Sequence, residues 1–167
     1  MAEGAAVAIE RFEVSRTVGA DPGTIFSLLC DPRGHVAIDS SGMLMSATGE
    51  PVRGVGDTFV VHMDREALND FPLGRYDVVV TIETFEQDRE LAWSIAGTER
   101  PSIGHLYGYR LEPAEGGTLV TSYYDWSAID ARVKERGIFP VISELALRAT
   151  LGILARTVAP DGPPPAG

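Results

Sequence analysis

Hydrophobic and polar residues alternate along most of the chain between residues 9 and 125, as in strands with one buried face. Short connections containing Gly and Pro separate these stretches, so we expect consecutive strands to pair as an antiparallel meander rather than a parallel sheet. The alternation predicts strands over 9–18, 43–48, 56–64, 74–86 and 90–97, followed by a hairpin over 105–125.

Three segments depart from this alternation. The first is "DPGTIFSLLCDP", where Asp21 suits an N-cap, Pro22 suits the first helical position and Pro32 ends a short helix. Residues 33–42 predict a second short helix or a turn. Residues 140–158 have helical periodicity and predict the longest helix, with an apolar surface so wide that we expect it to be covered around most of its girth.

The order of these elements predicts an α+β domain with a curved antiparallel sheet of about six to seven strands. A strongly twisted sheet of this size curls, and the long C-terminal helix can lie in its concave face. One helix rarely fills such a groove, so we expect a cavity between the helix and the sheet. We assign a single domain to 9–158 and expect flexible termini at 1–8 and 159–167.

Composition narrows the classes of partner. The net charge of −10 argues against nucleic acid, which needs a basic surface, and disfavours adsorption to anionic membranes. Cys30 is the single cysteine and lies in an apolar run, so we expect a buried thiol in a reduced, cytoplasmic protein. We expect no signal peptide, no integral membrane segment, no metal and no cofactor, and either a monomer or a homodimer.

The hairpin "HLYGYRLEPAEGGTLVTSYYD" carries unusually large polar-tipped side chains. If its turn centres on Glu115, His105 faces Asp125 and Tyr107 faces Tyr123, with β-carbons about 5 Å apart. The carboxylate would fix the imidazole tautomer and raise its pKa, so that His105 could act as a general base with the tyrosine hydroxyls beside it. His105, Asp125 and Tyr107 are therefore the candidate catalytic residues.

Two alternatives remain open for this hairpin. A slip of one residue would turn the second strand over, so that Tyr124 and Trp126 face inward and Asp125 faces water; we prefer the first register. His105 has a simpler interpretation as a partly buried structural histidine. Tyr107 and Tyr123 suit either core packing or the lining of a cavity.

Further candidates follow from the expected inward faces. The candidate ligand-binding residues are Phe59, Val61, Tyr76, Val78, Trp93, Tyr107, Tyr109, Tyr123, Leu145, Arg148 and Ala149. Arg148 suits a pair with Glu144 or the binding of an anionic ligand. We expect His62 to point outward and His35 to lie on the surface. The long connection at 63–75 suits either a lid or, preferably, local packing.

The start of the domain resembles a known family pattern. The matching positions are Ala20, Pro22, Ile25, Phe26, Leu29, Asp31 and Pro32. With "VGDTFVVH" and "ELAW", they make residues 10–158 resemble the SRPBCC superfamily, the START-like, helix-grip group that includes the birch-pollen allergen and the polyketide cyclase/dehydrase and lipid transport families. In the next segment the family commonly has tryptophans, whereas this chain has His35 and Ile38 and retains Asp39.

The resemblance implies a helix-grip fold and a small hydrophobic ligand, because members bind lipids, hormones, quinones or polyketides. Some members only carry ligands, some cyclise polyketides and some act on a chaperone ATPase. We therefore expect the chain to bind a small hydrophobic or amphipathic molecule in its cavity. The alternative is a cofactor-independent polyketide cyclase/dehydratase that uses the pair His105–Asp125.

Overall fold

The computed structural model describes residues 9–159, except for 70–71 and 98–101. The predicted flexible termini, 1–8 and 159–167, therefore lie outside the described residues, apart from Ala159. None of the helices within the described ranges is long and apolar enough to cross a bilayer.

The described chain forms one seven-stranded antiparallel sheet with helices on its concave side, which confirms the predicted α+β class. The strands follow the order β1-β7-β6-β5-β4-β3-β2, a meander in which the first strand pairs with the last. The elements are β1 (Arg11–Val18), α1 (Pro22–Cys30), α2 (Pro32–Ile38), β2 (Leu44–Thr48), β3 (Thr58–Asp64), the 3-10 turn η1 (Glu66–Leu68), β4 (Arg75–Glu86), β5 (Glu90–Gly97), β6 (Leu106–Ala114), β7 (Gly117–Asp125), α3 (Ala131–Lys134) and α4 (Glu144–Val158).

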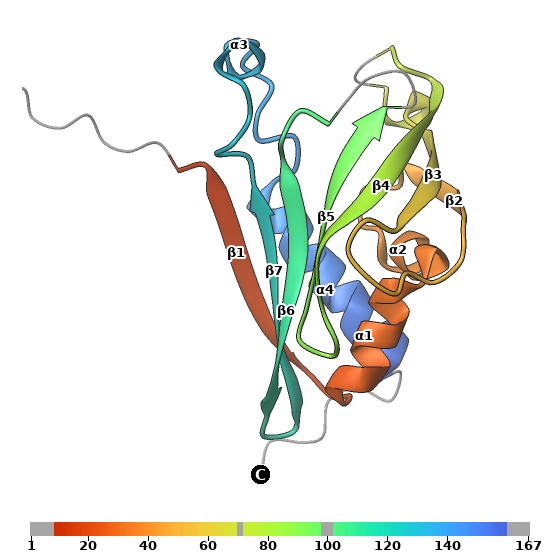
Figure 1. Cartoon of the computed structure of the whole chain (residues 1–167), viewed down its shortest axis with the longest axis vertical. Coiled ribbons are helices and arrows are strands. Elements are labelled where there is room, and N and C mark those ends of the chain that lie inside the picture. Colours follow the sequence, from red (N-terminus) through yellow and green to blue (C-terminus); the bar gives the residue numbers. More distant parts are fainter. Residues whose placement is uncertain (1–8, 70–71, 98–101, 160–167) are drawn as a thin grey trace, which may run out of the picture.

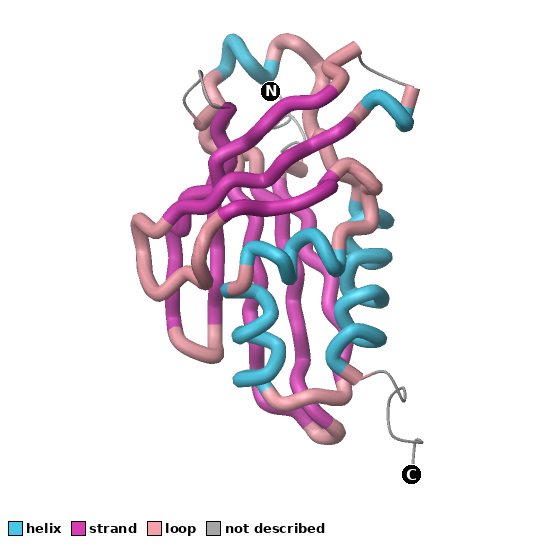
Figure 2. Tube along the Cα trace, turned by 90° about the vertical axis from the view of Figure 1, so that its right-hand side faces the viewer, coloured by secondary structure: helices cyan, strands magenta, loops and turns pink. Residues whose placement is uncertain are grey.

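The sheet is strongly bent around the helices. In Figure 1, α4 lies behind β5–β7, and α1 and α2 lie to the right of it. Figure 2 shows strands that run lengthwise behind the helices and others that cross above them at a steep angle. Helix α4 packs on β1, β7 and α2, so the sheet and the short helices grip it from two sides, as in the helix-grip fold.

The two short helices follow the predicted capping pattern. Asp21 accepts a hydrogen bond from the Thr24 backbone N–H and caps α1. Asp31 ends α1 and also caps α2, because its side chain accepts from the Arg33 N–H. One aspartate is therefore both the C-cap of α1 and the N-cap of α2, which fixes the turn between the two helices.

Helix α4 begins later than the sequence predicts. Its N-cap is Ser143, whose hydroxyl accepts the Ala146 N–H, so Pro140 precedes the helix instead of opening it. Leu147 and Leu151 are buried, whereas Leu145 is 75% exposed. The expected coverage around most of the girth is therefore wrong: the sheet and α2 contact one side of α4, and the opposite side faces solvent.

The hairpin adopts the alternative register. Ala114 pairs with Gly117, so the turn contains two residues, and Tyr107 pairs with Tyr124 rather than with Tyr123. Gly116 has φ 84°, a left-handed conformation that glycine adopts without steric cost. The preferred register assumed a turn centred on one residue. In the observed register the turn is centred between Glu115 and Gly116, and this shift of one residue in the pairing turns every side chain of β7 to the other face.

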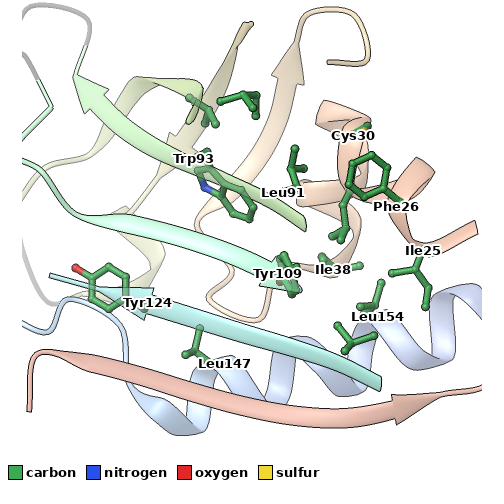
Figure 3. Close-up of a cluster of buried hydrophobic side chains, with 14 of the residues drawn as sticks. Ile25, Phe26, Cys30, Ile38, Leu91, Trp93, Tyr109, Tyr124, Leu147 and Leu154 are labelled. Carbon is green, nitrogen blue, oxygen red and sulfur yellow. The ribbon is translucent and has the colours of Figure 1, made fainter. Parts of the chain in front are cut away.

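Buried side chains pack closely at the end of the domain that contains α1. Figure 3 shows Ile25, Phe26 and Leu154 together at this end, with Trp93 and Tyr124 farther along the sheet. The rings of Phe26 and Phe85 meet edge to face, with centroids 5.3 Å apart. The solid part of the core therefore lies beside α1, and the opposite end is left to a cavity.

Candidate ligand-binding site

A cavity of about 800 Å³ lies between the concave face of the sheet, α2 and the first half of α4. It occupies the end of the domain where β4 and β6 begin, away from the β6–β7 turn at the lower end of Figure 1. The sheet reaches both sides of this space because it is bent, whereas α4 touches mainly β1 and β7. The cavity predicted between helix and sheet is therefore present.

Aromatic and aliphatic side chains form most of the wall. Seven of the candidate ligand-binding residues line the cavity: Val61, Tyr76, Val78, Trp93, Tyr107, Tyr109 and Tyr123. The indole of Trp93 is stacked beside two of these rings, with centroids 6.2 Å from Tyr107 and 5.8 Å from Tyr109. These neighbours form a continuous aromatic part of the cavity wall on β5 and β6.

Four other candidates do not reach the cavity. Phe59 is buried outside its wall, with its ring 5.2 Å from that of His35. Leu145 and Ala149 are exposed on the far side of α4. Arg148 is also exposed and donates to Glu144 over 2.9 Å, so it forms the helix-surface pair that was one of its two expected roles.

Because of the hairpin register, the side chains of Tyr123 and Asp125 lie on the convex face, even though Tyr123 is among the residues that line the cavity. The Tyr123 ring covers Gly108, whose missing Cβ would fall 2.3 Å from that ring, and its hydroxyl donates to Glu90 over 2.5 Å. Asp125 accepts from Arg11 over 3.0 Å. The expected His105–Asp125 pair is therefore wrong, since the two side chains belong to opposite faces of the sheet.

His105 instead contacts two tyrosines within the cavity. Its Nδ1 lies 2.9 Å from the hydroxyl of Tyr124, which is fully buried. The hydroxyls of Tyr124 and Tyr107 are also hydrogen-bonded to each other. The three side chains form a polar relay, which we call the His105–Tyr124–Tyr107 relay, and its two ends, His105 and Tyr107, border the cavity.

The relay is uncharged at neutral pH. Burial lowers the pKa of His105 to about 4, because a protonated imidazole would lose its hydration there. Burial also raises the pKa of Tyr124 to about 12 and holds that of Tyr107 well above its usual range. His105 is therefore a weak base in this site, contrary to the raised pKa expected from a carboxylate neighbour.

A neutral relay can run in two directions. If Tyr107 donates to Tyr124 and Tyr124 donates to Nδ1, then Nε2–H of His105 is a donor for the cavity and the Tyr107 oxygen an acceptor. If Nδ1–H donates to Tyr124, the order reverses and Tyr107 offers the donor. Either direction presents one donor and one acceptor to a bound molecule.

His35 is a cavity residue that the sequence analysis placed on the surface. It is buried, its Nε2 lies 2.7 Å from the Leu29 carbonyl oxygen, and its ring meets Trp93 with centroids 4.7 Å apart. Burial lowers its pKa to about 4, so Nε2–H donates to that carbonyl. The sequence does contain a signal for this burial: His35 is three residues before the apolar Ile38, so the two side chains share one face of a helix.

The charged groups at the cavity are few. Asp39 borders it, and its two carboxylate oxygens accept hydrogen bonds from the backbone N–H and the hydroxyl of Ser41 and from the backbone N–H groups of Gly42 and Leu44. Its negative charge adds to the effect of burial, which raises the pKa of Tyr109 to about 12. Asp39 therefore places a negative charge close to Tyr109.

Loops and the approach to α4 complete the cavity wall. This part of the wall includes Met43, Arg65, Leu68 of η1 and the segment 140–144. Leu68 is 40% exposed, so it borders the cavity and also faces solvent. Phe71, which belonged to the predicted lid or packing loop, lies outside the described residues.

Comparison with known proteins establishes the fold. No family model matches the chain, and no curated protein matches it. Among solved structures, protein CV1439 from Chromobacterium violaceum is 13% identical, with a TM-score of 0.65, covering 92% of this chain and 100% of its own. An AHSA1-like protein from Aeromonas hydrophila is 15% identical, with a TM-score of 0.57, covering 90% and 93%. The chain shares their fold.

The KanY protein extends this likeness, with 16% identity, a TM-score of 0.59 and coverage of 87% of this chain and 94% of its own. Identities this low concern the architecture alone. The chemistry of the site therefore has to be argued from the side chains that this chain places in its own cavity.

Proposed function

We propose that the protein binds a small hydrophobic or amphipathic molecule, of lipid, polyketide or aromatic type, in the cavity between the sheet and α4, as a member of the SRPBCC superfamily. The observation that carries the proposal is the cavity itself. Its volume of about 800 Å³ is in the range of small-molecule sites, and apolar walls with a few polar groups are their usual composition.

The walls supply the driving force for such binding. A ligand that removes about 200 Å² of apolar surface from water gains roughly 5 kcal/mol. The aromatic side chains of Trp93, Tyr107 and Tyr109 offer contacts to rings and chains alike, while Val61 and Val78 offer aliphatic contacts. The polar relay then orients the bound molecule.

These features favour a binding role over the acid–base alternative. The carboxylate that was to raise the basicity of His105 is on the other face of the sheet, paired with Arg11. A histidine with a pKa of about 4 is a poor acceptor for a proton on carbon near neutral pH. It remains a good hydrogen-bonding group, which suits recognition of a ligand.

Fluorescence of Trp93 gives a direct test. The chain has two tryptophans, so Trp126→Phe leaves Trp93, in the cavity wall, as the only reporter. In a screen of lipids, quinones and aromatic polyketides, at least one compound should change this emission, and native mass spectrometry should show a complex of one ligand per chain. If no compound of these classes binds by either measurement, the proposal is wrong.

A matched pair of variants locates the binding site. Ala146 borders the cavity, whereas Ala149, one turn further along α4, is exposed and outside it. We expect Ala146→Trp to fill the cavity and abolish binding, and Ala149→Trp to leave binding unchanged. Equal effects of the two substitutions would place the ligand elsewhere.

A further inference from the structure

The polar groups inside the cavity define the chemistry of the ligand more narrowly than its apolar walls do. We infer that the ligand carries an uncharged hydrogen-bonding group, a hydroxyl or a carbonyl, held by the His105–Tyr124–Tyr107 relay. The expected ligands are thus phenols, alcohols, ketones or quinones rather than carboxylates or amines. This inference rests on the proposed function and deepens it.

The first support is the unused hydrogen-bonding capacity at the ends of the relay. Nδ1 of His105 is hydrogen-bonded to Tyr124, and none of the described residues forms a hydrogen bond with its Nε2. Tyr107, at the other end, borders the same cavity. Because the middle hydroxyl is fully buried and occupied by both neighbours, only the two ends are available to a ligand.

The second support is the charge around the cavity, which disfavours an anion. Among the described side chains that border it, the one Lys or Arg is Arg65, in the loop after β3, and its charge is not among the causes of the pKa shifts of His105, Tyr107 or Tyr124. Asp39 adds a negative field near Tyr109, and His105 is neutral at pH 7. A carboxylate on the relay would therefore lose its hydration without gaining an opposite charge.

A cation also lacks a suitable partner. The oxygens of Asp39 already accept four hydrogen bonds from the turn at 41–44, and Glu144 is paired with Arg148. An ammonium group would have to compete with these donors to satisfy its own three N–H groups. Burial of an amine at the relay is thus costly for the same reason as burial of an acid.

The third support is that the relay adapts to either neutral group. A carbonyl needs a donor, which His105 Nε2–H supplies in one direction and Tyr107 O–H in the other. A hydroxyl needs both a donor and an acceptor, and the two ends offer one of each. Reversal requires only hydroxyl rotation and a change of imidazole tautomer, so no charge is created.

Four pyrene probes test the inference at pH 7: pyrene, 1-hydroxypyrene, 1-pyrenecarboxylate and 1-pyrenemethylammonium. They share one flat ring system and differ in the group presented to the relay. Binding is measured through Trp93 in the Trp126→Phe protein and through probe anisotropy. We expect 1-hydroxypyrene to bind most tightly, ahead of pyrene by roughly five- to tenfold, the size of one neutral hydrogen bond, and ahead of both charged probes.

A pair of Tyr→Phe variants assigns the preference to the relay. Tyr107→Phe removes one end of it and should bring the affinity for 1-hydroxypyrene close to that for pyrene. Tyr123→Phe is the matched control on the next strand, because its hydroxyl is on the convex face, bonded to Glu90, and should leave the preference intact. The ratio of the two affinities is insensitive to partial misfolding, since a smaller active fraction affects both probes equally.

The outcomes separate this inference from the function on which it rests. Binding of 1-pyrenecarboxylate or 1-pyrenemethylammonium as tightly as 1-hydroxypyrene overturns the inference and leaves the binding function standing. An equal affinity for pyrene and 1-hydroxypyrene, or a preference that survives Tyr107→Phe, overturns it as well. Failure of all four probes, pyrene included, contradicts both proposals.

Discussion

Two neutral histidines, His35 and His105, contribute polar atoms to a mostly apolar cavity. Each is 8% exposed, and burial lowers the pKa of each to about 4. In an unfolded chain the same side chains have a pKa near 6.5. The unfolded state therefore takes up protons first as the pH falls, and folding becomes less favourable.

We accordingly predict that the free energy of unfolding decreases as the pH falls below about 6.5. The stability that each neutral histidine provides is fully present above that value and is lost progressively toward a pH of about 4, by about 2 kcal/mol for each of them at pH 5. Urea denaturation between pH 7.5 and 5 measures the slope, and His105→Gln should remove about half of it. A wild-type stability that is constant over this range would contradict the prediction.

The side of the sheet on which the Tyr123 side chain lies depends on a difference of one residue in the β6–β7 turn. The alternation within β6 places Tyr107 and Tyr109 on the same side whichever residues form the turn, and both border the cavity. The face of β7 depends in addition on the length of the turn, and the two-residue turn sends Tyr123 outward over Gly108. A hairpin sequence with two adjacent glycines fits more than one loop length, so local pattern alone left this face undecided.

At the scale of elements, α4 illustrates the same limit. Its sequence carries two apolar stripes, one through Leu147, Leu151 and Leu154 and one through Leu145 and Ala149. Helical periodicity identifies both equally well. The first is buried because it meets the sheet and α2, and the second is exposed because nothing in the described chain covers it.

The two stripes predict opposite outcomes for the same substitution. Leu151→Ala should reduce the free energy of unfolding by about 2–5 kcal/mol, because it leaves a hole in a closely packed core. Leu145→Ala, on the same helix, should change it by no more than about 0.5 kcal/mol. Denaturation by urea, followed by circular dichroism, compares them; similar losses would mean that α4 presents a different face to the sheet.

At the scale of the whole molecule, the domain is solid at one end and hollow at the other. The α1 end is filled by Ile25, Phe26 and Leu154, while the opposite end encloses about 800 Å³. A bent seven-stranded sheet produces this asymmetry, since a straight helix contacts its concave face over only part of its length. A ligand in the hollow end would complete the core.

Ligand binding should therefore stabilise the whole fold. At a free concentration of 100 times Kd, 1-hydroxypyrene is expected to add about 2.7 kcal/mol to the free energy of unfolding. For a domain of this size this corresponds to a rise in Tm of several degrees, on the order of 5–10 °C. Thermal denaturation with and without the probe measures the rise. Ala146→Trp should suppress it, and a rise that persists in that variant would point to binding outside the cavity.

The sequence by itself determined the order and type of the seven strands and of α1, α2 and α4, because the signals for them are local; η1 and α3 were not predicted. Strand alternation, the caps at Asp21 and Asp31 and the prolines beside them act within a few residues, and the structure follows them. The inward face of β6 belongs to the same class, since it needs only the alternation of a single strand.

Only the tertiary structure decided which face of β7 and of α4 borders the interior, that His35 is buried, and that His105 meets Tyr124 instead of Asp125. Each of these depends on contacts between segments distant in sequence, where a one-residue slip or the placement of one helix reverses the outcome. The low pKa of both buried histidines has the same origin, because desolvation is a property of the surroundings that the fold assembles and not of the neighbouring residues in the chain.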